Sequence, residues 1–246
     1  MMNWQPLFDK RFRLFQIKYS LFDAILVLGL AYYIFVVRPS SIYQLVVLGL
    51  SVVVHEVAHG AAANALGDPT AKQLGRLSMN PLVHVDPLGT VILPGLLILS
   101  GSGFLIGWAK PVPVDTRHFK QPLRDMMLVA LAGPVSNVIL AAIAAVIFRT
   151  FLSFNPALTD FSAMMVDVLQ YTVMINLVLA VFNMLPIPPL DGSRMMAFLL
   201  PDGPRYTYMS LEPYGFFIIM ILAFFNGFSV ILYATVPPLI RLFLGG

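Results

Sequence analysis

The sequence predicts an α-helical polytopic membrane protein with about five to six membrane-spanning segments. Hydrophobic residues make up 59% of the 246 residues and charged residues only 11%, whereas soluble domains average about 45–50% and about 25%. Long apolar stretches recur along the chain, and basic residues gather in a few of the loops between them. Both patterns are typical of helices that cross a lipid bilayer. The net charge of +3 therefore indicates no nucleic-acid partner.

Six apolar segments approach the roughly 20 residues that a spanning helix needs. They are residues 21–37, 43–66, 88–107, 126–148, 164–185 and 214–243. The last segment is interrupted by Asn226-Gly227 and by Pro237-Pro238. These interruptions predict either one kinked helix or two short helices.

The segment 88–107 differs from the others because Pro94-Gly95 in its middle disfavours a continuous helix. Suppose that the N-terminus is cytoplasmic and that this segment enters the membrane and returns to the same side. Twelve basic residues then lie inside and three outside, whereas a crossing segment would give eight and seven. Cytoplasmic loops carry the excess of Lys and Arg, so we predict that residues 88–107 form a re-entrant or partly β segment.

The chain is expected to have two parts, a cytoplasmic N-terminal segment at residues 1–20 and a single membrane-embedded domain at residues 21–246. The first part is basic and aromatic and has no evident signal-peptide cleavage site. The chain contains no cysteine, which excludes disulfides, thiolate zinc sites and cysteine nucleophiles. Any metal site must therefore use His, Asp or Glu.

A His-Glu-x-x-His pattern, His55-Glu56-Val57-Ala58-His59, lies within the second apolar segment. On a helix, residues four apart share a face, so both imidazoles can reach one metal ion. Glu56 follows His55 directly and can meet a water at the metal without being a ligand itself. Ionisable residues at membrane depth are costly and usually functional. The pattern thus predicts a hydrolytic metal site within the bilayer.

A third protein ligand is needed, and Asp191 is the best candidate. It ends the sequence Asn183-Met184-Leu185-Pro186-Ile187-Pro188-Pro189-Leu190-Asp191-Gly192, whose prolines must break the fifth apolar segment. With a re-entrant third segment, Asp191 falls on the same side as the end of the His-Glu-x-x-His helix. With a crossing segment it would face the other side, so charge counting and ligand geometry favour the same topology.

Together these motifs resemble the site-2 protease family of intramembrane zinc metalloproteases. Ala132-Gly133-Pro134-Val135-Ser136-Asn137 also resembles that family's Gly-Pro-x-x-Asn signature, and motifs at residues 80–87 and 107–114 resemble a compact prokaryotic branch. The resemblance covers residues 52 to 192. No insert of about 80 residues could hold the PDZ or CBS module that many relatives carry.

The resemblance implies that one Zn2+ per chain is bound by His55, His59 and Asp191, with Glu56 as the general base. It implies cleavage of single-span membrane proteins in or near their spans, as in regulated intramembrane proteolysis. Combined with the charge count, it predicts a multi-pass cell-membrane protein whose N-terminus and active site face the cytoplasm.

The resemblance further implies that Asn137, and Asn183 with less support, hold the substrate backbone or the developing oxyanion. Asn137 could instead hydrogen-bond a neighbouring helix, and Asn183 could satisfy backbone groups that Pro186 frees. His84 could gate water or orient a metal ligand, or it could be an ordinary loop histidine.

Two other functions use the same residues. A divalent metal-ion transporter could employ the His and Asp side chains as a transient site, but it would need polar groups on both sides of the membrane midplane. An inactive scaffold of the same fold would not need the complete set of His, Glu and Asp side chains that the sequence retains.

Overall fold

The computed structural model describes residues 41–93, 96–97, 107–154 and 159–245. The described residues divide into two compact units, a smaller one within 41–42 and 85–110 and a larger one within 43–84 and 111–245. Within the described ranges the secondary structure is helical and no strand occurs, which confirms the predicted helical class. The expected segments 1–20 and 21–37 lie outside the described residues.

Within the described residues, four helical stretches are long and apolar enough to cross a membrane, as a multi-pass protein requires. They are Tyr43–Ala65, Pro122–Phe154, Phe161–Asn183 and Asp202–Phe224. The longer helices are α2 (Ser41–Ala65), α5 (Pro122–Phe154), α6 (Asp160–Asn183), α9 (Gly215–Phe224) and α10 (Ser229–Leu244). The shorter elements of the larger unit are α3 (Thr70–Gln73), η2 (Pro81–His84), η4 (Thr116–His118), α7 (Asp191–Leu199), α8 (Asp202–Met209) and η5 (Glu212–Tyr214).

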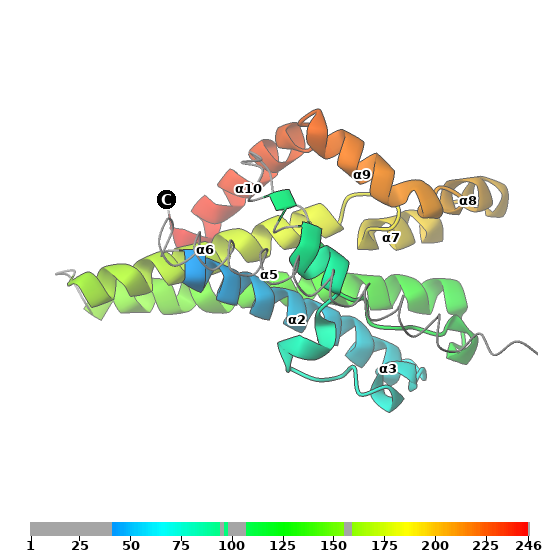
Figure 1. Ribbon diagram of the computed structural model, residues 1–246, viewed down its shortest axis with the longest axis horizontal. Helices are drawn as coiled ribbons and strands as arrows, with labels where there is room; N and C mark the ends of the chain where they lie inside the picture. The colour runs from blue at the N-terminus through cyan, green and yellow to red at the C-terminus, as the bar shows by residue number, and fades with distance from the viewer. Residues whose placement is uncertain (1–40, 94–95, 98–106, 155–158, 246) are drawn as a thin grey trace, which may run out of the picture. The chain divides into compact units, whose positions relative to one another are not determined.

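Helices α5, α6 and α10 pack against one another (Figure 1), around a core of alanine, valine and leucine side chains. Ala141, Ala144 and Ala145 of α5 meet Val173 and Leu177 of α6. Small residues let two membrane helices approach closely, which is the main source of packing energy between them. The opposite side of α5 exposes large apolar side chains such as those at positions 146 and 147, as expected for a surface in contact with lipid.

The last apolar segment forms two short helices, one of the two predicted outcomes. Helix α9 ends at Phe224, and Asn226 adopts a left-handed conformation with φ of 58°. The N–H groups of Asn226 and Gly227 donate to the carbonyls of Ala223 and Leu222. This pattern is a Schellman helix end. The two prolines in α10 do not interrupt that helix.

In the smaller unit, the two ends of segment 88–107 meet. The N–H of Trp108 donates to the carbonyl of Gly89 at 3.1 Å, and the hydroxyl of Thr90 donates to the carbonyl of Trp108 at 2.8 Å. The segment starts with the helical turn η3 (Pro87–Ile92), which the side chain of Asp86 caps. The part of this segment that the structure describes contains no strand, and residues 94–95 and 98–106 lie outside the described residues.

Candidate metal centre

The two histidines of α2 are held by hydrogen bonds from their Nδ1 atoms. Nδ1 of His59 lies 2.8 Å from the backbone carbonyl of Val129, and Nδ1 of His55 lies 2.6 Å from the side-chain oxygen of Asn137. A carbonyl oxygen can only accept, so in each ring Nδ1 carries the hydrogen. In a neutral imidazole the Nε2 atom then has a free lone pair, which is the form that binds a metal ion.

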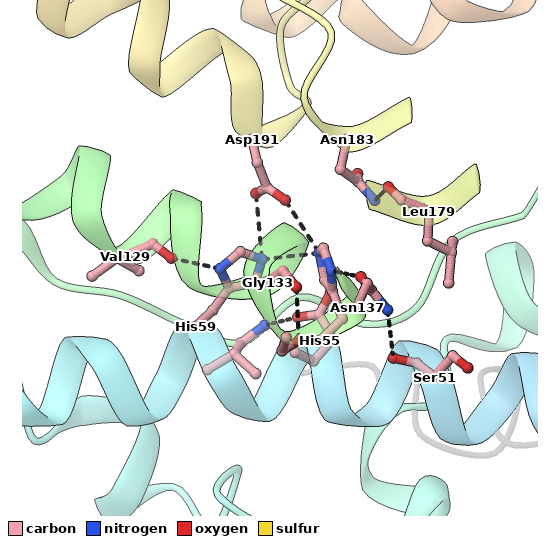
Figure 2. Close-up of polar contacts among 12 residues, drawn as sticks. Ser51, His55, His59, Val129, Gly133, Asn137, Leu179, Asn183 and Asp191 are labelled. Carbon is pink, nitrogen blue, oxygen red and sulfur yellow. Dashed lines mark hydrogen bonds and ion pairs between the residues drawn. The ribbon is translucent and has the colours of Figure 1, made fainter. Parts of the chain in front are cut away.

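These two lone pairs converge with the carboxylate of Asp191 (Figure 2). The two Nε2 atoms are 3.0 Å apart, and they lie 3.1 Å and 3.3 Å from the oxygens of Asp191. Acceptors gathered this closely repel one another unless a cation lies between them. A tetrahedral zinc ion with bonds of about 2.0–2.1 Å separates its ligand atoms by about 3.3 Å. Oδ2 of Asp191 is buried and has no hydrogen-bond partner among the described residues, so the donor set fits a divalent metal ion.

Asp191 reaches the histidines because the chain turns sharply after α6. Helix α6 ends at Asn183, and after a seven-residue turn α7 begins with Asp191. Gly192 packs directly on the carbonyl of Met184, where a side chain would collide with the backbone. The predicted break of this segment thus brings Asp191 to His55 and His59, as the sequence indicated.

Gly133 provides the space in which the two imidazoles lie. A Cβ atom at this position would lie 2.5 Å from Cε1 and Nε2 of His59 and 2.6 Å from Cε1 of His55. Carbon atoms in ordinary contact are about 3.5–4.0 Å apart, so no larger residue fits without moving a ring. The glycine of the Gly-Pro motif on α5 is therefore explained by the packing of the site.

Glu56 lies beside this cluster and is not a member of it. Its Oε2 accepts a hydrogen bond of 2.9 Å from the backbone N–H of Val112. Gly60, one turn further along α2, leaves room for two side chains, because a Cβ there would lie 2.5 Å from Leu77 and 3.0 Å from Val112. One carboxylate oxygen of Glu56 is thereby oriented by a fixed backbone donor.

Asp68 holds the other end of the segment that carries Val112. It is fully buried and accepts hydrogen bonds from Thr70 and from the N–H of Asp115, and His118 lies 3.0 Å away. Burial alone would raise the pKa of Asp68, but the hydrogen bonds from Thr70 and Asp115 and the nearby His118 outweigh it and lower the pKa. Arg117 and its backbone N–H likewise hold the pKa of Asp115 well below its usual range.

The other predicted residues are not members of the cluster of two His and one Asp, although Asn137 contacts it through Nδ1 of His55. Asn137 is fully buried, and its amide nitrogen donates to Asn176 at 2.8 Å and to the carbonyl of Ser51 at 3.4 Å. The amide of Asn183 donates to the carbonyl one turn earlier in its own helix, at 3.0 Å. His84 is buried in η2, with Nε2 bonded to the carbonyl of Ser78 at 2.9 Å.

Four residues that contact the site were not predicted from the sequence. Val129 and Val112 contact His59 and Glu56 through backbone groups, and a backbone group leaves no signal in the choice of side chain. Ser51 and Asn176 are single polar residues in apolar helices, and only their burial at membrane depth could have indicated a function.

Comparison with known proteins agrees with the geometry of the cluster. The sequence model of the family described as peptidase family M50 matches residues 43–163 and 154–225 of the chain. The chain is 40% identical over 191 residues to YwhC of Bacillus subtilis, covering 76% of this chain and 84% of that protein. It is 31% identical over 194 residues to Rip2 of Mycolicibacterium smegmatis, covering 76% and 70%. Both names contain the words zinc metalloprotease. No solved structure matches significantly.

Proposed function

The chain belongs to peptidase family M50, and from this premise we propose that it is an intramembrane zinc endopeptidase that cleaves single-span membrane proteins in or near their spans. The observation that carries the proposal is the convergence of His55, His59 and Asp191 beside Glu56. Both histidines and Glu56 lie in Tyr43–Ala65, one of the four stretches that can cross a membrane. A hydrolytic residue set on a membrane-spanning helix indicates a substrate that is itself in the membrane.

His55, His59 and Asp191 would hold one zinc ion per chain, which leaves a coordination position open for water or substrate. When bound, zinc acidifies water and polarises a carbonyl as a Lewis acid. Glu56 would accept the proton of the water that attacks the peptide carbonyl and pass it to the amide nitrogen that leaves. The products are one new carboxylate and one new amine. The N–H of Val112 fixes Oε2 of Glu56, so Oε1 remains for the proton.

The arrangement of basic residues supports a cytoplasmic active site. In the larger unit, seven Lys and Arg residues lie at the end that carries the C-terminus of α2, the start of α5 and the helices α7 and α8. Only Arg149 and Arg241 lie in the later parts of α5 and α10. Because positive charge marks the cytoplasmic side, we assign this end, which is also the nearer end to His59, to the cytoplasm.

Two contacts support a re-entrant path for segment 88–107. The guanidinium of Arg76 donates to the carbonyls of both Val83 and Pro111, which are close to where the chain leaves and re-enters the larger unit. Within the smaller unit, Gly89 and Trp108 are hydrogen-bonded to each other. A segment whose ends are adjacent returns to the side from which it started.

The decisive experiment replaces Glu56 by Gln in purified protein reconstituted into liposomes together with a tagged single-span substrate. We expect Glu56→Gln to retain zinc and to lose cleavage, because the amide cannot accept the proton. Glu212→Gln is the matched control, since Glu212 is the chain's other glutamate and pairs with Arg194 far along the sequence. Cleavage by the Glu56→Gln protein would contradict the mechanism. Cleavage of soluble unfolded proteins in preference to the membrane substrate would contradict the substrate class.

A further inference from the structure

The Asn137 side chain belongs to a buried chain of polar contacts that joins three helices. Its oxygen accepts from Nδ1 of His55 on α2, and its nitrogen donates to the oxygen of Asn176 on α6. The nitrogen of Asn176 in turn donates to the hydroxyl of Ser51 and to the carbonyl of Thr172, each at 2.9 Å. Figure 2 shows the first part of this chain, from His59 through His55 and Asn137 to Ser51.

The direction of every bond in this chain is determined. The carbonyls of Thr172 and Ser51 can only accept. The hydroxyl of Ser51 donates to the carbonyl of Val47 at 2.8 Å, so it accepts from Asn176. The nitrogen of Asn176 must therefore face Thr172 and Ser51, which leaves its oxygen facing Asn137.

The orientation of Asn176 fixes that of Asn137. With the oxygen of Asn176 and the carbonyl of Ser51 on one side, the Asn137 amide nitrogen must point toward them, and its oxygen must point toward His55. A reversed Asn137 would present N–H groups to Nδ1 of His55. The hydrogen of the ring would then move to Nε2, the atom that faces Asp191 and His59, and His55 could no longer offer a lone pair there.

We propose that Asn176 is a positioning residue, which acts through the amide of Asn137 to keep His55 in the Nδ1–H tautomer required for metal binding. This proposal rests on the proposed metal site. It assigns Asn137 to the orientation of a ligand, because its two N–H groups are used inside the protein and no part of it is exposed. Groups that orient a metal-binding histidine typically change metal affinity by about 10–100-fold when they are removed.

The test uses Asn176→Leu, which keeps the size of the side chain and removes its hydrogen bonds. Selective ¹⁵N labelling of histidine gives a simple spectrum, since the chain has four histidines. In metal-free protein, we expect wild-type His55 to show one Nδ1–H tautomer and the variant to show a mixture. Zinc affinity should fall at least about tenfold. Thr172→Val is the matched control, because it removes a hydroxyl of α6 that bonds only to Val168 and leaves the Thr172 carbonyl in place.

A compensating variant separates orientation from simple loss of packing. In Asn137→Asp the carboxylate accepts from His55 with either oxygen, so its orientation no longer matters. We expect the double variant Asn137→Asp, Asn176→Leu to regain most of the zinc affinity and the single Nδ1–H tautomer. Asn176→Asp should also retain both, because a carboxyl buried at this depth is favoured in its neutral form. One oxygen then accepts from Asn137, and the O–H donates to the Thr172 carbonyl in place of the amide N–H. These two variants keep the test informative if Asn176→Leu alone does not fold.

The proposal is overturned if Asn176→Leu keeps the wild-type tautomer and zinc affinity, if Thr172→Val loses as much affinity as Asn176→Leu, or if the double variant regains neither property. The tautomer is measured without metal and without substrate. A chain that bound no zinc at all would refute the proposed function, and the tautomer comparison would still decide this inference.

Discussion

Replacing Gly133 by alanine should remove zinc without unfolding the protein. The new Cβ would lie 2.5 Å from two atoms of the His59 ring and 2.6 Å from one atom of the His55 ring. Normal contact requires about 3.5–4.0 Å, so a ring or the backbone must move by about 1 Å or more. Both rings are held by their Nδ1 hydrogen bonds, and functional constellations tolerate displacements of about 0.5 Å.

The loss of function should exceed the loss of stability. A misplacement of about 1 Å can cost about 100-fold in activity, and we expect zinc affinity and cleavage to fall by at least that factor. Overpacking costs about 1–3 kcal/mol, but alanine in place of a helical glycine returns about 1 kcal/mol. The free energy of unfolding of the metal-free protein should therefore change little.

Competition with a chromophoric chelator measures zinc affinity, and thermal unfolding of the metal-free protein measures stability. Gly49→Ala is the control, because Gly49 is also a helical glycine but a Cβ there would meet no atom within 4 Å. If Gly133→Ala bound zinc as tightly as Gly49→Ala, a Cβ atom at residue 133 would not displace the imidazole rings, and the prediction would be refuted.

Three further outcomes are expected. Asp191→Ala should lower zinc occupancy of purified protein to a small fraction, because only two ligands remain; full occupancy would contradict the proposed ligand set. Asp68→Asn should make stability depend less on pH at acid pH. The pKa of Asp68 is lowered in the folded state, so its stabilising contribution is present above about pH 3.9 and is lost as the pH falls through the folded pKa. Thermal unfolding of both proteins at several pH values below about 5 measures this dependence, and an equal pH dependence in wild type and variant would refute it. Gly60→Val should reduce cleavage but not zinc content, because the new side chain would push on Leu77 and on Val112, whose N–H orients Glu56. Zinc assays beside cleavage assays test this, and unchanged cleavage would contradict it.

The spans and the joining of Asp191 to the histidines could be predicted because strong local rules govern them. Apolar length identified α2, α5 and α6 to within six residues at either end, and the prolines before Asp191 required a helix break there. The break at Asn226-Gly227 follows from the tolerance of Asn and Gly for left-handed backbone. Each of these signals depends on neighbouring residues alone.

The hydrogen-bond partners of the Asn137 amide could not be predicted in the same way. Whether its amide faces a substrate or a neighbouring helix depends on what α6 presents to it, and Asn176 is 39 residues away. A lone Asn in an apolar helix has no periodic pattern to indicate its face. The same limit applies to Val112 and Val129, whose backbone groups contact Glu56 and His59 whatever their side chains are.

The polar contacts of Ser51, Asn137 and Asn176 connect the register of the helices to the chemistry of the site. Four bonds link α2, α5 and α6 among these three residues and His55. Measured contacts of this kind average about 0.6 kcal/mol each, so together they contribute roughly 2–3 kcal/mol to stability. Their larger effect is geometric, because a shift of one helix by a single residue would separate the amides and release the His55 ring. A substitution that changes this register far from any ligand should therefore lower zinc affinity more than it lowers stability.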